Sequence, residues 1–344
     1  PHEKAESLSK TWLAIGIRTD EQADRTRRAD GLLKTLASAV PKEDTQYEGW
    51  FHFARTWAEL VALTLESDMV LPESTRQEMV TLQTRIDSVL VSWLKSRYAG
   101  LINLPPVPPV MLHHIPRFLS RYIRDDKEHK VAFVLLDGLS LDQWIVIRKE
   151  LAKQRPRYRF RENAVFAWIP TITSVSRQAA FAGKPPIYFP NSIHTTEKEP
   201  ALWTQFWVDQ GLTQKEVAYA KGLGDGNLDS VEVMVARPRT RVVGLVVDKV
   251  DKIMHGMELG SAGMHNQVRQ WAGQPFMANL VDLLLENGFH VYLSSDHGNI
   301  EAAGCGRPAE GAIADLRGER ARIYSDPLLR SQVKERFPDA LEWP

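Results

Sequence analysis

The chain has 344 residues, which is long for a single hydrophobic core and indicates two domains or three. Hydrophobic residues make up 43% of it and charged residues 25%, which excludes a disordered or fibrous protein. Lys and Arg together number 43, as do Asp and Glu, so the net charge provides no overall attraction to nucleic acid. A local basic groove is still compatible with this balance.

Targeting and membrane signals are not evident in the sequence. No apolar run approaches the roughly 18 residues that cross a membrane, and residues 1–4 lack a signal-peptide pattern. Cys305 is the only cysteine, so an intramolecular disulfide is excluded and a cytoplasmic location is expected. Because the sequence does not start with Met, we expect it to be a fragment of a longer protein.

The N-terminal part, residues 1–104, is predicted to be a helical domain. Apolar residues recur at helical spacing over 75–98 and over 49–66, and Thr75 with Glu78 fits a capping box. Residues 105–129 then form a proline-rich linker followed by a short helix. We interpret the adjacent histidines of this segment, His113 and His114, as surface or packing residues.

From residue 130 the pattern changes to that of an α/β domain, which we expect to extend over 130–344. Short continuous apolar runs cover 131–136, 242–247 and 291–293 and alternate with helical segments. Such runs are typical of buried, mostly parallel strands. Residues 184–238 show no clear strand rhythm and are predicted to be an insertion, or a cap over the site.

Acidic residues follow each of the three predicted strands. Because ligands bind at the carboxyl ends of strands in open α/β sheets, these side chains should meet at one edge. Carboxylates mixed with imidazoles suit a divalent metal such as Zn or Mn, in one or two ions. The alternative is that each Asp only caps the following helix. The residues concerned are Asp137, Asp248, Asp251, His255, Asp296 and His297.

A hydroxyl-rich stretch at residues 170–183 lies between the first two strands and contains the candidate nucleophile. The hydroxyls are those of Thr171, Thr173, Ser174 and Ser176, where a loop meets a helix. The alternative is an ordinary hydroxyl-rich helix N-terminus, with one of them as the N-cap. Beside a metal, a helix N-terminus also suits a nucleophile that binds phosphate.

The order and spacing of these motifs resemble the alkaline phosphatase superfamily. Sulfatases of that superfamily carry Cys-x-Pro-Ser-Arg, then four residues, then Thr-Gly. Here the stretch from Thr173 to Arg177 is followed at the same spacing by Ala182-Gly183. This similarity selects Thr173 among the hydroxyls as the nucleophile.

The residue sequences of the motifs are most similar to those of the PglZ family of BREX phage-resistance systems. Three segments resemble motifs of that family: Val-Leu-Leu-Asp137-Gly-Leu-Ser, the run from Pro170 to Arg177, and Ser-Ser-Asp296-His-Gly-Asn. The resemblance spans about residues 130–325. It implies an alkaline-phosphatase-like three-layer α/β/α sandwich after the helical region, and other BREX proteins as partners.

The resemblance also implies a set of metal ligands. Asp137, Thr173, Asp296 and His297 would hold one metal, and Asp251 with His255 would hold a second. Asp248 is an alternative to Asp251, although Asp251 alone has the family's four-residue step to His255. The superfamily usually has a further histidine after Asp-His-Gly, and this sequence has none after His297. The candidate replacements are Glu301, Cys305, Glu310 and His265.

The implied activity is metal-dependent hydrolysis of a phosphoester by in-line attack of Thr173, through a covalent phosphothreonine. A nucleic-acid phosphodiester such as DNA fits the defence context, and a monoester is the alternative substrate. Arg177 would brace the loop or contact a phosphoryl oxygen, and its alternative is an exposed helix arginine. The competing hypothesis is a degenerate phosphatase fold that serves as a scaffold without catalysis.

Overall fold

The computed structural model describes residues 8, 11, 21–66, 69–224, 226–304, 314, 316–317 and 321–338. The chain divides into two compact units. The first takes residues 1–96, 141–156 and 257–273, and the second takes 97–140, 157–256 and 274–344. The domain boundaries expected from the sequence remain a proposal.

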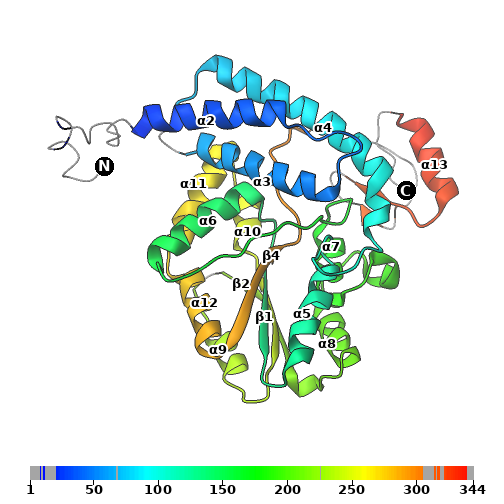
Figure 1. Ribbon diagram of the computed structural model, residues 1–344. Helices are drawn as coiled ribbons and strands as arrows, with labels where there is room; N and C mark the ends of the chain where they lie inside the picture. Colours follow the sequence, from blue (N-terminus) through cyan, green and yellow to red (C-terminus); the bar gives the residue numbers. More distant parts are fainter. Residues whose placement is uncertain are drawn as a thin grey trace. The chain divides into compact units, whose positions relative to one another are not determined.

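The first unit is helical, which confirms the character predicted for the N-terminal region (Figure 1). Helix α3 packs against α2 and α6, and α6 also packs against α11. In its core the rings of Trp50 and Trp93 lie 5.9 Å apart, and the Trp93 indole donates a 2.7 Å hydrogen bond to the carbonyl of Thr45. Its helices are α2 (Glu21–Ser38), α3 (Tyr47–Thr64), most of α4 (Glu73–Leu101), α6 (Leu141–Gln154) and α11 (Gly260–Ala272).

The predicted capping box at Thr75 is wrong. Helix α4 already begins at Glu73, and the N–H of Arg76 donates to the carbonyl of Pro72. Thr75 therefore lies inside the first turn, and its hydroxyl donates to Asp30 instead, at 3.5 Å.

The second unit is built on a four-stranded parallel sheet in the order β2-β3-β1-β4. The side chains of the two central strands, β1 and β3, are buried, which explains their continuous apolar runs. The edge strand β2 was not expected, because its half-exposed sequence alternates too weakly to indicate a strand. The strands are β1 (Lys130–Leu136), β2 (Val217–Leu223), β3 (Val242–Val247) and β4 (Phe289–Ser295).

Helices cover both faces of this sheet, α12 on one and α5 with α8 on the other (Figure 1). This arrangement confirms the predicted α/β fold. Gly244 of β3 lacks a side chain, and a Cβ at this position would lie only 2.9 Å from the ring of Trp203 in α8. The glycine thus allows α8 to pack closely on the sheet.

The helices of the second unit are α5 (His114–Asp125), α7 (Thr173–Ala182), α8 (Glu199–Asp209), α9 (Asp229–Val235), α10 (Lys249–His255), α12 (Phe276–Glu286) and α13 (Pro327–Arg336). Short elements are the 3-10 turns η2 (Pro186–Tyr188), η3 (Pro190–Ser192) and η4 (Gln214–Glu216), and the antiparallel pair β5 (Leu316–Arg317) and β6 (Arg322–Ile323).

The histidines after the proline-rich segment are packing residues and not surface residues, which were the two interpretations offered by the sequence. His113 and His114 are fully buried, and each places Nε2 3.3 Å from the carbonyl of Ile102. His114 Nδ1 accepts from the N–H groups of Val110 and Met111, at 3.3 Å each. Burial, together with the charge of His114, lowers the pKa of His113 to about 3.

None of the described helices is both long enough and apolar enough to span a membrane.

Candidate metal centre

The candidate site lies at the carboxyl ends of the strands. The last residue of β1, Leu136, pairs with the last residues of β3 and of β4. The residues that follow these strand ends are Asp137, Asp248 and Asp296, so they leave the sheet at the same edge. This is the edge at which open α/β sheets bind ligands.

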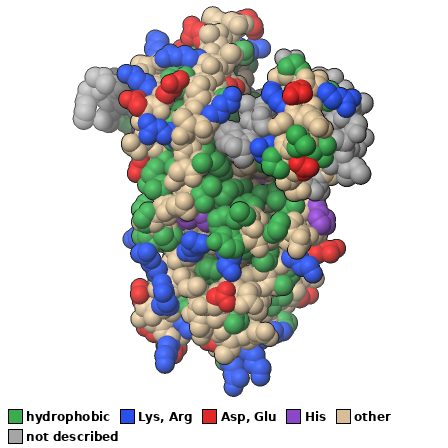
Figure 2. Space-filling view, turned by 90° about the vertical axis from the view of Figure 1, so that its right-hand side faces the viewer, with side chains coloured by type: hydrophobic (Ala, Val, Ile, Leu, Met, Phe, Trp, Pro, Cys, Tyr) green, Lys and Arg blue, Asp and Glu red, His purple; other side chains and the backbone are tan. Residues whose placement is uncertain are grey.

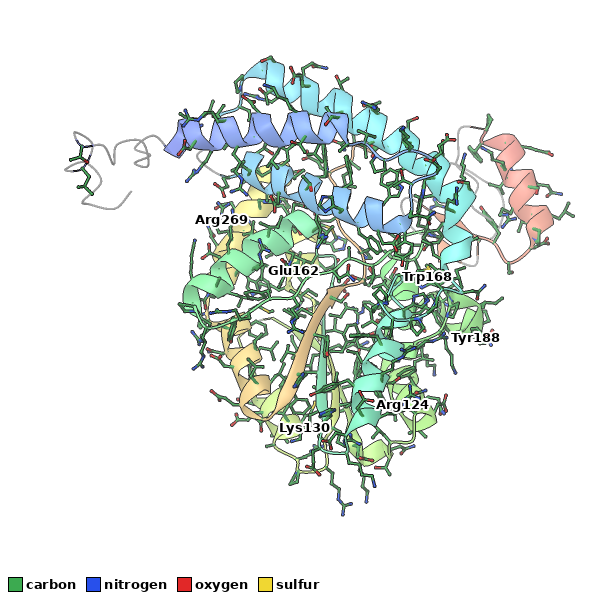
Figure 3. All side chains as sticks on the ribbon, in the orientation of Figure 1. Arg124, Lys130, Glu162, Trp168, Tyr188 and Arg269 are labelled. Carbon is green, nitrogen blue, oxygen red and sulfur yellow. The ribbon has the colours of Figure 1, made fainter. Side chains whose placement is uncertain are left out.

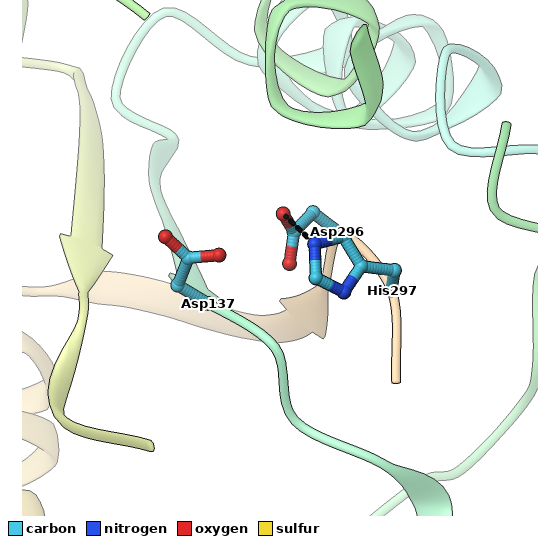
Figure 4. A group of neighbouring side chains, drawn as sticks. All are labelled: Asp137, Asp296 and His297. Atoms are coloured by element: carbon cyan, nitrogen blue, oxygen red, sulfur yellow. Dashed lines mark ion pairs between the residues drawn. The ribbon is translucent and has the colours of Figure 1, made fainter. Parts of the chain in front are cut away.

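Asp137, Asp296 and His297 form one buried group at this edge. One potential ligand atom from each lies within 4.8 Å of the others. The residues are only 3%, 0% and 8% exposed, respectively. The two carboxylates face one another, with the imidazole beside Asp296 (Figure 4). Nε2 of His297 lies 3.3 Å from Oδ2 of Asp296.

The backbone that carries Asp137 and Asp296 is cross-linked next to the group. The N–H of Gly138 donates to Oδ1 of Asp296 at 3.0 Å, and the Asn299 amide donates to the carbonyl of Gly138 at 2.6 Å. Gly138 has a φ of +69°, which side-chain-bearing residues rarely adopt. The two hydrogen bonds of the Gly138 backbone therefore join the turn after β1 to the loop after β4, and the positive φ of this residue favours glycine there.

The charges of this group are unbalanced in a way that fits a cation. Asp137 Oδ1 and Asp296 Oδ2 are buried and accept no hydrogen bond from the part of the chain that the structure describes. Burial and the neighbouring charge of Asp137 raise the pKa of Asp296 well above its usual range, against the lowering effect of the Gly138 N–H and Arg177. A divalent ion would relieve this repulsion, and mixed carboxylate and imidazole donors suit Zn or Mn. The residues present therefore fit a divalent metal.

His297 is oriented so that Nε2 faces the group. Its Nδ1 lies 2.8 Å from the carbonyl of Gly298, and because a carbonyl only accepts, Nδ1 carries the hydrogen. The lone pair is then on Nε2, and it accepts from the Thr173 hydroxyl at 2.9 Å. A histidine that donates one ring N–H to a carbonyl and presents the other nitrogen is typical of metal ligands.

Among the four hydroxyls of residues 170–183, that of Thr173 contacts the buried group, through His297. It is the first residue of α7, at the end where backbone N–H groups are free to bind an anion. The Ser174 hydroxyl instead donates to the carbonyl of Ile193 at 2.6 Å. Ser176 is completely buried, and Thr171 precedes the helix.

Arg177 is buried rather than exposed, and it connects the group to α8. Its guanidinium donates to Oδ2 of Asp137 at 2.7 Å and to Oε2 of Glu199 at 2.6 Å. Burial alone would lower the pKa of Arg177, but the charges of Glu199 and Asp137 outweigh it and raise the pKa. Tyr219 donates to the same Glu199 oxygen. Burial also raises the pKa of Glu199, and burial with the charge of Glu199 raises the pKa of Tyr219.

Glu199 and Tyr219 were not predicted from the sequence. Glu199 is the first residue of α8 and Tyr219 lies in β2, the strand that shows no clear pattern. No motif marks either residue, so only the fold brings them to Arg177.

Asp251 and His255 lie near the buried group but not within it. A side chain at Gly138 would lie 3.8 Å from Cβ of Asp251, so the two are neighbours. Burial and the charge of Asp137 raise the pKa of Asp251, while His255 and His297 lower it. His255 Nε2 lies 3.4 Å from Oδ1 of Asp251, and its side chain is 75% exposed.

The alternative ligands lie elsewhere or are not described. Asp248 forms an ion pair with Lys252 at 3.1 Å. His265 belongs to the first unit, where its Nε2 pairs with Asp142 of α6. Glu301 is exposed. Cys305 and Glu310 lie outside the described residues.

Comparison with known families gives a match over most of the C-terminal two thirds of the chain. Residues 117–338, more than half of the chain, match the family model PglZ, described as the BREX system PglZ alkaline phosphatase-like domain. The match includes all the residues of the candidate site. It confirms the resemblance drawn from the motifs. The comparison with curated proteins gave no match.

Proposed function

We propose that this chain, which belongs to the PglZ family of BREX alkaline phosphatase-like domains, is a metal-dependent phosphoester hydrolase. The observation that carries the proposal is the 2.9 Å hydrogen bond between Thr173 Oγ1 and His297 Nε2. It sets a hydroxyl at a helix N-terminus against a buried group that suits a cation.

In this proposal Asp137, Thr173, Asp296 and His297 hold one divalent ion, Zn or Mn, and Asp251 with His255 holds a second. A bound ion would lower the pKa of the Thr173 hydroxyl and offset negative charge on the phosphoryl group. Arg177 positions Asp137 by its direct hydrogen bond, and Glu199 holds Arg177 in turn.

The reaction proceeds in two displacements. Oγ1 of Thr173 bonds to phosphorus while the ester bond to the leaving oxygen breaks, and the hydroxyl proton ends on the leaving alcohol. Water then attacks phosphorus, which releases the phosphate product and restores the Thr173 hydroxyl. The backbone N–H groups at the start of α7 bind a phosphoryl oxygen during both steps.

The substrate we propose is a phosphodiester of nucleic acid, so that the protein acts as a nuclease in bacterial anti-phage defence. Membership in a BREX family supports a role together with other BREX proteins. We place this activity in the cytoplasm.

A second candidate function is a scaffold without catalysis. The observation that favours it is the position of His255, whose side chain is 75% exposed and outside the buried group. With an incomplete second metal site, a phosphatase fold can keep its structure and lose turnover.

Metal content and turnover of the same preparation distinguish the two functions. Protein purified without chelator should contain Zn or Mn by elemental analysis and should hydrolyse bis(4-nitrophenyl) phosphate. Dialysis against EDTA should stop hydrolysis, and added Mn or Zn should restore it. Bound metal without hydrolysis would favour the scaffold, and absence of both would contradict the metal site.

A further inference from the structure

A cavity in the second unit is lined by cationic side chains. It has a volume of about 360 Å³, and its charged lining residues are Arg117, Arg121, Arg124, Lys184 and Asp209. The lining therefore has a net charge of +3 in a chain whose overall net charge is zero. This concentration of charge is local and concave.

The three arginines share one face of α5. Their spacing of four and then three residues places them on successive turns of the helix, so they extend over about 10 Å along its axis. Arg124 is near the end of α5 (Figure 3). Lys and Arg side chains are spread over the upper and the lower parts of the face drawn in Figure 2.

The fold holds part of this surface in place and leaves the rest available. Arg117 donates through Nε to the carbonyl of Gly183 at 2.7 Å, which fixes the guanidinium at the cavity. Lys184 and Asp209 lie 3.7 Å apart and partly offset each other. The side chains of Arg121 and Arg124 are exposed and have no ion-pair partner among the described residues.

A solvated helix face would explain isolated arginines, and on such a face a cation can pair with a carboxylate. Arg28 with Glu59 and Lys153 with Glu150 are such pairs on this chain, at 3.5 and 2.7 Å. Two guanidiniums without an ion pair among the described residues, those of Arg121 and Arg124, in line with that of Arg117 at the cavity suit a ligand with several phosphates in a row.

From these observations we infer that the α5 cavity binds the phosphodiester backbone of a nucleic-acid strand. Phe206, the aromatic residue of the lining, is buried and offers no face for base stacking. Recognition is therefore by phosphate contacts and independent of sequence.

This site is separate from the candidate metal centre. Gly183 ends α7 and Thr173 begins it, and a helix of ten residues is about 15 Å long. The inference concerns binding alone and does not require hydrolysis at Thr173.

The test measures binding without cleavage, in EDTA, with fluorescently labelled 20-mers of thymidylate DNA and of uridylate RNA. The double variant Arg121→Ala, Arg124→Ala should weaken binding on the order of tenfold at 0.1 M salt, and it should flatten the slope of log K against log salt by about 1.4, since two phosphate contacts to a single strand are lost. The charge-matched control, Arg28→Ala, Lys153→Ala, should bind like the parent. Melting temperatures of both variants establish that they fold.

Each outcome decides the inference. Weaker binding of both oligomers in the α5 variant alone supports a shared phosphodiester site, and weakening for one oligomer alone supports the site and identifies the sugar. Equal weakening in the control would reduce the effect to net charge and overturn the inference. A parent that binds neither oligomer, or binds inorganic phosphate alone, would overturn it as well.

Discussion

The hydroxyl oxygen of Thr173 lies 2.9 Å from Nε2 of His297, although 124 residues of sequence separate them. The bond joins the first residue of α7 to the loop after β4, next to two buried carboxylates. Because Nδ1 of His297 is fixed by the carbonyl of Gly298, the direction of Nε2 is set by the backbone. The pair therefore meets in a geometry that needs no rearrangement of the fold.

Thr173→Ala should abolish metal-dependent hydrolysis of a phosphodiester, by at least about a thousandfold in kcat, because it removes the nucleophile. The melting temperature should stay near that of the parent, since Thr173 is only half-buried. Rates are measured with bis(4-nitrophenyl) phosphate at saturating metal.

The matched control is Ser174→Ala, whose hydroxyl donates to the Ile193 carbonyl and not to the buried group. It should keep most of the activity. Parental activity in Thr173→Ala would remove the covalent mechanism and leave direct attack by water.

Loss of the buried group should release metal. The double variant Asp296→Ala, His297→Ala should retain much less Zn or Mn than the parent, because it removes two of the three clustered ligand atoms. The variant Asp251→Ala, His255→Ala should lose at most one ion, since these residues lie outside the cluster. Elemental analysis after identical purification compares the three proteins, and equal metal in parent and first variant would show that our ligands are wrong.

Metal should also stabilise the parent. A ligand at a hundredfold excess over its Kd adds about 2.7 kcal/mol to the free energy of unfolding. We therefore expect the melting temperature of EDTA-treated protein to rise by several degrees when Mn or Zn is added, and the Asp296→Ala, His297→Ala variant to show no such rise.

The parts that the sequence predicts well are those with local signals. β1 and β3 are central strands buried on both faces, so their apolar runs are continuous. β4 is a partly exposed edge strand, and it is marked by its short apolar run over 291–293 and by Asp296 with His297 directly after it. β2 carries no such run because it is a half-exposed edge strand. The partners of Arg177 could not be predicted, since Glu199 reaches it only through the packing of α8 on α7.

Acid should destabilise the second unit through His113. Its pKa is about 3 in the folded chain and about 6.5 when exposed, so the unfolded state binds more protons between these values. Stability is therefore lost as the pH falls below about 6.5. From pH 7.5 to 5.5 this group should account for about 1.4 kcal/mol of lost stability.

His113→Gln keeps a donor for the Ile102 carbonyl but cannot be protonated, so its urea unfolding should show a smaller loss over that interval. His194→Gln is the control, because His194 is exposed and its surroundings change little on unfolding. An unchanged pH dependence in His113→Gln would contradict the lowered pKa.

The bond between Glu199 and Arg177 should matter for both stability and turnover. Glu199→Ala leaves the Arg177 guanidinium buried beside a single carboxylate, and removing one partner of a buried ion pair costs roughly 3–5 kcal/mol. Glu199→Gln should cost less, since the amide oxygen still accepts from Arg177. The comparison is Glu59→Ala, which breaks the exposed pair with Arg28 and should cost less than about 1 kcal/mol. Urea unfolding gives the three free energies of unfolding.

The same bond should matter for turnover. In Glu199→Gln, Arg177 loses its second charged partner, so Asp137 is held less firmly and kcat should fall while KM changes little. Parental kcat in that variant would show that Glu199 serves stability alone, and equal losses of stability in Glu199→Ala and Glu59→Ala would contradict the buried network itself.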